Sequence, residues 1–192
     1  MDIVGQFFQT DGAHPSFPGI LWRARGFSGD VSEKSGIDRV TEDAAARGLE
    51  VEIVERPAAD SLEEAAALLG LEPGDIVKSL VVKRHDGGFL FALIPGDRQI
   101  SWPKLRAVVG VNKLSMPHQD VALEATGYER GTITPIGSST AWPVYLDASV
   151  SGHRVALGAG APGHSAFVDA DSLATAYGAV VTDISEPITP RS

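Results

Sequence analysis

The segments IVKSLVVK (residues 76–83) and FLFALI (residues 89–94) decide the fold of this chain. The tetrapeptide HDGG at 85–88 lies between them and is typical of a β-hairpin turn. Successive side chains of a strand point to opposite faces, and both faces of the first segment are largely apolar. The pattern therefore predicts a hairpin whose first strand is central in a sheet.

Helices and further strands are expected on both sides of this hairpin. Upstream, the sequence predicts a helix over 37–47, a strand around 49–54, and a helix over 61–70 that begins with a Ser-x-x-Glu capping box. Downstream, it predicts helices over 101–110, 118–125 and 171–177 and strands near 144–146, 154–157 and 179–182.

Helices and hairpins are mixed rather than strictly alternating, which predicts an α+β fold. We expect a single domain with a mixed, mostly antiparallel curved sheet flanked by helices. The first 36 residues are rich in Gly and Phe and have no sustained period. The expected division is an N-terminal, loosely ordered extension over 1–36, the folded domain over 37–185 and a C-terminal tail over 186–192.

Composition excludes several classes of function. The chain has no Cys, so it has no disulfide, no thiol nucleophile and no zinc site of the CxxC type. No apolar run could span a bilayer and no signal peptide is visible, which predicts a cytoplasmic protein without a membrane partner. None of the five His forms a pair at helical metal-ligand spacing, so neither a metal nor another cofactor is expected.

The charge is uneven along the chain. The net charge of −9 opposes a broad, non-specific grip on nucleic acid. Residues 76–113 nevertheless carry seven basic side chains against two acidic ones. Such a segment could meet a nucleic acid locally, or its side chains could simply be solvated.

Lys78 is the first candidate for function. A lysine within an apolar strand must find a partner, extend its amine to water, or carry a shifted pKa. A functional amine and a lysine that reaches solvent from the strand end both satisfy these conditions.

Two glycine-rich segments are the next candidates. GYERGTITPIG at 127–137 could present backbone N–H groups to an anion or a developing oxyanion, or it could be an ordinary turn. GAGAPG at 158–163 matches the dinucleotide pattern GxGxxG, but Pro162 and the apolar stretch 165–168 do not resemble the helix start that this pattern requires. Its glycines could instead line a pocket.

Taken in order, these segments resemble the YbaK/ProX family of aminoacyl-tRNA deacylases, freestanding relatives of the bacterial prolyl-tRNA synthetase editing domain. The resemblance extends from about Ile37 to Ile184. It depends chiefly on Lys-Ser-Leu at 78–80 and on Gly-Tyr-x-x-Gly-x-x-x-Pro-x-Gly at 127–137. It implies a YbaK-like fold and trans-editing, the hydrolysis of the ester bond of a mischarged tRNA.

The resemblance also assigns residues. It places Lys78 at the position of the family's essential lysine, and Ser79 where the family often has Thr or Ser. Cysteine-clearing members have Ser and Asp at the positions of Gly158 and Ser165, and this difference argues against a Cys-tRNA substrate. The residues expected to bind the substrate are Ser79, Gly131, Pro135, Gly158, Gly160 and Gly163.

The expected mechanism uses the protein's own groups. An aminoacyl ester is already activated, so the protein need only position it and stabilise charge. Lys78 as ammonium would stabilise the tetrahedral oxyanion, an effect worth about 3–4 kcal/mol. A neutral Lys78 acting as general base is the competing version, and it needs a lowered pKa.

Partners and alternatives follow from the same resemblance. The expected partner is the acceptor end of tRNA, with a synthetase as a possible second partner. The expected tRNA contacts are Arg98, Lys104, Arg106 and Lys113. The alternatives are a non-catalytic module of the same fold that binds tRNA, a synthetase or a small ligand, and a hydrolase of another activated ester or thioester.

Overall fold

The computed structural model describes residues 34–57, 59 and 61–188. The chain divides into two units, 1–32 and 33–192, and every described residue belongs to the second. The predicted extension over 1–36 lies outside the described residues up to position 33, as does the end of the predicted tail from position 189.

The described residues form five α-helices, three of which begin at a side-chain cap. Ser35 caps the first helix and forms a capping box with Asp38, and the Ser61 side chain accepts a hydrogen bond from the Glu64 N–H at the start of the second. Each helix ends at a glycine with positive φ, which closes the last turn without a Cβ clash. The helices are α1 (Gly36–Arg47), α2 (Leu62–Leu69), α3 (Trp102–Val109), α4 (Gln119–Thr126) and α5 (Ala170–Tyr177).

The strands of the described residues form three sheets. A five-stranded sheet has the order β5-β2-β3-β6-β9, a three-stranded sheet has the order β1-β8-β7, and β10 pairs with β4. The strands are β1 (Glu52–Glu55), β2 (Val77–Arg84), β3 (Phe89–Pro95), β4 (Arg98–Ile100), β5 (Leu114–Ser115), β6 (Val144–Asp147), β7 (Arg154–Gly158), β8 (His164–Asp169), β9 (Val180–Thr182) and β10 (Ser185–Pro187). Two 3₁₀ helices, η1 (Pro73–Asp75) and η2 (Ala148–Val150), complete the described elements.

The predicted hairpin is the centre of the large sheet. Strands β2 and β3 pair antiparallel over seven residues, from Val77 opposite Pro95 to Lys83 opposite Phe89. Strand β6 joins β3 in parallel, and β9 joins β6 in parallel. The other pairings between the described strands are antiparallel, and an isolated parallel bridge joins Ile76 to Ala156 of β7. The α+β class with a mixed, mostly antiparallel sheet is therefore confirmed.

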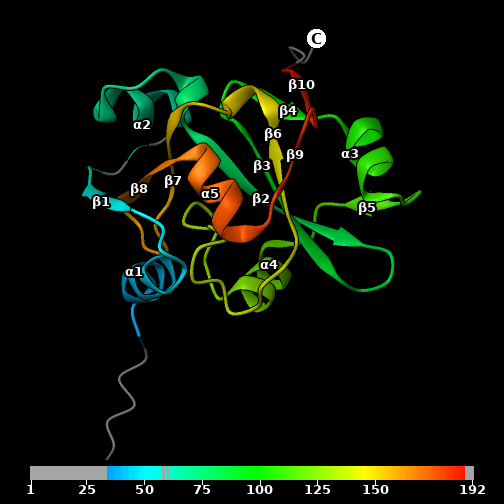
Figure 1. The fold of residues 1–192 in the computed structure, drawn as a ribbon, viewed down its shortest axis with the longest axis horizontal. Helices are drawn as coiled ribbons and strands as arrows, with labels where there is room; N and C mark the ends of the chain where they lie inside the picture. The colour runs from blue at the N-terminus through cyan, green and yellow to red at the C-terminus, as the bar shows by residue number, and fades with distance from the viewer. Residues whose placement is uncertain (1–33, 58, 60, 189–192) are drawn as a thin grey trace, which may run out of the picture. The chain divides into compact units, whose positions relative to one another are not determined.

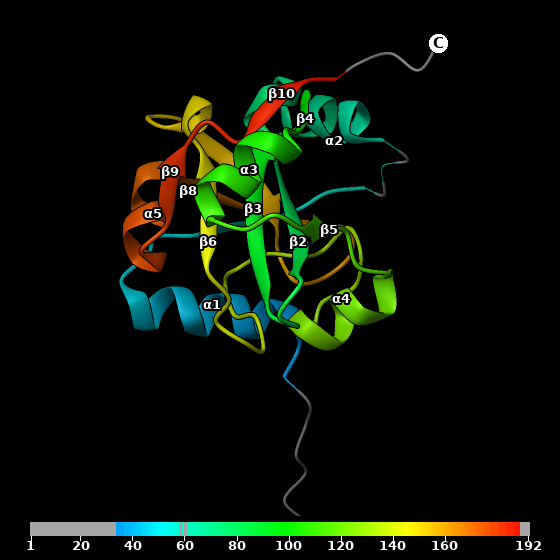
Figure 2. The same cartoon turned by 90° about the vertical axis from the view of Figure 1, so that its right-hand side faces the viewer.

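Alternation along β3 creates two cores, one on each face of the large sheet. Phe91 and Leu93 pack toward α1, α5 and the three-stranded sheet, whereas Leu90, Ala92 and Ile94 pack toward α3 and β4. Both views place α1 and α4 at one end of the sheet and α2, β4 and β10 at the other (Figure 1, Figure 2).

Candidate active site

A cavity of about 490 Å³ lies where β2 meets the turn after α4 and the β7–β8 pair. Its wall includes residues from both glycine-rich segments, from β2 and from the start of α2. Four of the predicted site residues line it: Lys78, Ser79, Gly131 and Gly158. A volume of this size is typical of a small-molecule pocket.

Lys78 is partly buried, and its amine has an internal partner. The Nζ atom donates a hydrogen bond to the backbone carbonyl of Arg98, the first residue of β4. Burial lowers the pKa of Lys78 below the ordinary value of 10.5, while the nearby carboxylates of Asp97 and Glu63 oppose this shift. The neighbouring acids therefore favour the charged form that burial disfavours.

Ser79 follows Lys78 on β2 and points to the opposite face of the sheet. Its Oγ atom is buried and has no hydrogen-bond partner in the described part of the chain. A buried hydroxyl without a partner is uncommon, because leaving it unsatisfied carries a desolvation cost. The hydroxyl is thus a donor that other protein groups leave unused beside the cavity.

The two glycine-rich segments touch one another. A Cβ atom on Gly158 would lie 2.3 Å from the carbonyl oxygen of Ile133 and 2.6 Å from that of Thr132. Two residues further on, the N–H of Gly160 donates to the Thr132 carbonyl at 3.0 Å. Glycine at 158 therefore lets the 127–137 loop lie directly against β7, and together they form one wall of the cavity.

The other predicted substrate-binding residues are not among those that line the cavity. Pro135 is buried, and neither it nor Gly160 nor Gly163 lines the cavity. Gly160 instead lies against Gly36, where a Cβ would be 2.6 Å from the Gly36 carbonyl oxygen. Substrate contact by these three residues stays a prediction from the sequence.

The predicted tRNA contacts lie outside the cavity, and two of them have partners within the protein. The Arg98 Nε donates to Ser185 Oγ at 2.6 Å, and Lys104 Nζ pairs with Asp183 at 2.7 Å. Arg106 and Lys113 make no ion pair or side-chain hydrogen bond to the described residues. Contact with tRNA remains a prediction for all four residues. Of the four, only the side chains of Arg106 and Lys113 have no partner among the described residues.

Sequence reasoning missed two cavity arginines. Arg56 follows β1, and its Nε donates to the buried Ser165 hydroxyl at 3.1 Å. Arg130 precedes Gly131 in the glycine-rich loop and is exposed. With Lys78 they are the three basic residues of the described lining, which includes no Asp or Glu. The Lys78 amine itself is bonded to the Arg98 carbonyl. Only the position of Arg130 in a singled-out loop could have indicated this role.

The described residues contain no cluster of three His, Cys, Asp or Glu side chains that could hold a metal ion. No helix among them is long and apolar enough to cross a membrane. The polar lining of the described cavity consists of the amine of Lys78, two guanidinium groups, the His164 imidazole, the Gln119 amide, the hydroxyls of Ser61, Ser79 and Ser165, and backbone amides.

Comparison with known proteins shows which family the chain is similar to. The family model of the aminoacyl-tRNA editing domain matches residues 56–176. A solved structure of a protein proposed to be a trans-editing enzyme for prolyl tRNA synthetase is 31% identical, with a TM-score of 0.73 over 80% of this chain and 98% of that one. The hypothetical protein APE2540 is 29% identical, with a TM-score of 0.72 over 77% and 99%. No curated protein matches the chain.

Proposed function

We propose that this chain, which belongs to the family of aminoacyl-tRNA editing domains, hydrolyses the ester that joins a wrongly attached amino acid to tRNA. The observation that carries the proposal is the lining of the cavity. Lys78, Arg56 and Arg130 line it without a described carboxylate, although the whole chain has a net charge of −9. Such a lining suits the anionic end of a nucleic acid. The substrate would place the protein in the cytoplasm.

Lys78 is the proposed catalytic residue. An ammonium group has three donors, and the Arg98 carbonyl accepts one of them. The remaining two could reach the ester and ribose oxygens and stabilise the oxyanion that forms when water attacks the ester carbon. The Asp97 and Glu63 carboxylates favour this charged form. The general-base version of the mechanism needs a neutral Lys78, and burial favours the neutral form because it lowers the pKa of Lys78.

The wall made by Gly131 and Gly158 is the proposed platform for the aminoacyl-adenosine end. The backbone of Gly131 is open, because a Cβ there would meet nothing within 4 Å, whereas the space beside Gly158 is occupied by the Thr132 and Ile133 carbonyls of the same wall. The unpartnered Ser79 hydroxyl supplies a further donor. The arrangement needs only positioning and charge stabilisation, which is sufficient for an activated ester.

Arg56 and Arg130 are the proposed phosphate contacts at the cavity, and Arg106 and Lys113 the proposed contacts outside it. Replacing Arg56 and Arg130 with Gln should weaken tRNA binding and reduce its dependence on salt, because fewer phosphates are neutralised. A synthetase partner would supply additional affinity for tRNA. An unchanged salt dependence would exclude the two cavity arginines from phosphate binding.

Replacement of Lys78 tests the catalytic assignment. In Lys78→Ala, single-turnover deacylation of a mischarged tRNA should fall by about 10²–10³-fold, the usual effect of removing one oxyanion-stabilising group. Lys83→Ala is the matched control, since Lys83 lies on the same strand, is exposed and does not line the cavity. A folded Lys78→Ala protein with full activity would contradict the assignment.

A hydrolase of another activated ester or thioester could use the same cationic cavity. Assaying the wild-type protein on a panel of mischarged tRNAs and on small aminoacyl thioesters separates the two functions. Turnover of thioesters alone would favour this second function, and binding of charged tRNA without turnover would identify a non-catalytic module.

A further inference from the structure

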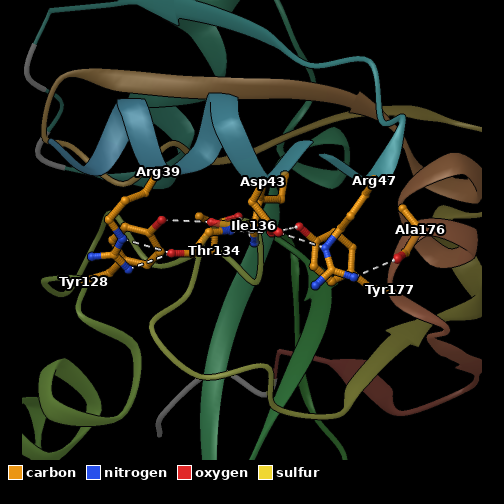
Figure 3. A network of polar contacts seen from close by, with 9 residues as sticks. Arg39, Asp43, Arg47, Tyr128, Thr134, Ile136, Ala176 and Tyr177 are labelled. Atoms are coloured by element: carbon orange, nitrogen blue, oxygen red, sulfur yellow. Dashed lines mark hydrogen bonds and ion pairs between the residues drawn. The ribbon is translucent and has the colours of Figure 1, made fainter. Parts of the chain in front are cut away.

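Three charged residues at four-residue spacing form a stripe along one side of α1. Arg39, Asp43 and Arg47 all point from the helix toward the 127–137 loop and α5 (Figure 3). The stripe precedes the segment that the family model matches, which begins at residue 56. Arg39 and Asp43 form hydrogen bonds with the 127–137 loop, which is part of the cavity wall.

Arg39 holds both ends of the glycine-rich loop. At the first end, its Nη2 donates to the Thr126 carbonyl at 2.9 Å and its Nη1 to the Gly127 carbonyl at 3.0 Å. At the second end, Nη2 and Nε donate to the Gly137 carbonyl at 2.7 and 3.0 Å. The guanidinium also stacks on the Tyr128 ring, 4.2 Å from its centre. One planar side chain thus fixes the separation of the two ends.

Asp43 holds the second end from the other side. Its Oδ2 accepts the N–H of Gly137 at 2.8 Å and the hydroxyl of Tyr177 (Figure 3). Burial raises the pKa of Asp43, but hydrogen bonds from Tyr177, Gly137 and Arg47 outweigh this effect and lower it overall. The carboxylate is therefore ionised at neutral pH, and both polar backbone groups of Gly137 are bound by α1.

Helix α1 and the 127–137 loop pack so closely at Gly137 that a side chain larger than that of glycine has no space between them. A Cβ on Gly137, whose φ is +68°, would lie 2.5 Å from the Arg39 carbonyl oxygen. At its first turn the same helix touches the other glycine-rich segment, because a Cβ on Gly36 would lie 1.8 Å from the Gly160 carbonyl oxygen. Helix α1 therefore contacts both segments that build the cavity wall.

The middle of the held loop is the part that lines the cavity. Arg130, Gly131 and Ile133 lie between the two fixed ends and face the space where the substrate is proposed to bind. We propose that Arg39 and Asp43 are positioning residues for ester hydrolysis, which set the place of this wall without touching the substrate. The expected effect on catalysis rests on the proposed deacylase function. The expected effect on the loop rests only on the contacts described above.

Paired replacements on α1 test the proposal. Arg39→Ala removes the bonds to the loop, whereas the control Arg47→Ala removes contacts to Asp43 and α5 and none to the loop itself. Arg47 donates to Asp43 Oδ1 at 3.0 Å and to the Ala176 carbonyl at 3.1 Å, and it lies 4.2 Å from the centre of the Tyr177 ring. The Gly137 N–H is bound by the other carboxylate oxygen of Asp43, Oδ2, which Arg47 does not contact. The measurements are the melting temperature, backbone hydrogen exchange across 127–137, and kcat and KM for deacylation by the full chain.

In Arg39→Ala, we expect faster exchange in the loop and a fall in kcat/KM of at least tenfold, since small misplacements of a site are costly. In Arg47→Ala, exchange in the loop should stay as in the wild type and kcat/KM should change by less than threefold. Asp43→Asn keeps an oxygen that can accept the Gly137 N–H, so it should retain most of the activity that Asp43→Ala loses.

Two results would overturn the proposal: unchanged loop exchange in Arg39→Ala, or equal losses of kcat/KM in Arg39→Ala and Arg47→Ala. A wild-type protein that hydrolyses no charged tRNA would instead refute the proposed function. In that case the exchange measurements still decide whether Arg39 and Asp43 hold the loop.

Discussion

Gly158 is the position where a single methyl group should separate folding from activity. In Gly158→Ala, the new Cβ would meet the Ile133 carbonyl oxygen at 2.3 Å, whereas carbon and oxygen atoms ordinarily approach to about 3.3 Å. The loop must therefore withdraw from β7 by roughly 1 Å. Overpacking of this kind costs about 1–3 kcal/mol, which in a domain of this size lowers the melting temperature by roughly 2–12 °C.

The kinetic effect should be larger than the effect on stability. Withdrawal moves the wall that holds Ile133 and Gly131, and a displacement of about 1 Å at a catalytic site can reduce the rate about 100-fold. The assay is single-turnover deacylation together with thermal unfolding. Gly74→Ala is the control, because a Cβ there meets nothing closer than 3.6 Å. A folded Gly158→Ala protein with the wild-type kcat/KM would refute the argument that the place of the wall matters.

Three further predictions concern stability. Asp147 is buried, and burial raises its pKa, but hydrogen bonds from partners that include the Ile184 N–H lower it overall below the ordinary value of 3.8. Asp147→Asn should therefore cost roughly 1.5–3 kcal/mol at neutral pH, and urea titrations should show the difference from wild type shrinking as the pH falls below 3.8. Phe91→Ala, at 1% exposure in the main core, should cost about 3–5 kcal/mol in the same assay, and a loss below 1 kcal/mol would contradict the described packing. Arg154→Gln should leave the melting temperature nearly unchanged, because its ion pair with Glu52 is exposed on both sides and such pairs contribute little.

The sequence predicted elements well where local signals are strong. The hairpin, the Ser61 cap and the helix-ending glycines depend on residues close together in the chain, and they lie where they were expected. Strands β4, β5 and β10 have two or three residues each, too few to show a period, and they form because partners distant in sequence pair with them. The apolar stretch 165–168, left unassigned from the sequence, lies in β8, where β1 and β7 pair with it on either side.

The candidate site was only partly predictable for a related reason. A glycine pattern cannot tell whether the missing side chain makes room for a ligand or for another part of the backbone. Gly158 and Gly160 both lie against backbone carbonyls, and only Gly158 also lines the cavity. The cationic lining depends on Arg56, which its own sequence neighbours do not mark and which long-range pairing of β1 with β8 brings to the cavity.

The hydrogen bond between Lys78 and the Arg98 carbonyl has a consequence for the order in which the parts of the site fold. The carbonyl that accepts the hydrogen bond from its amine belongs to β4, and β10 is the strand that pairs with β4 among the described residues. The β2–β3 hairpin contains contacts close in sequence and can form early, but β4 must pair with β10, and Arg98 and Ser185 are 87 residues apart in the chain. A folding intermediate with a complete central hairpin would thus carry an unanchored amine, and catalytic competence would arrive among the last steps of folding.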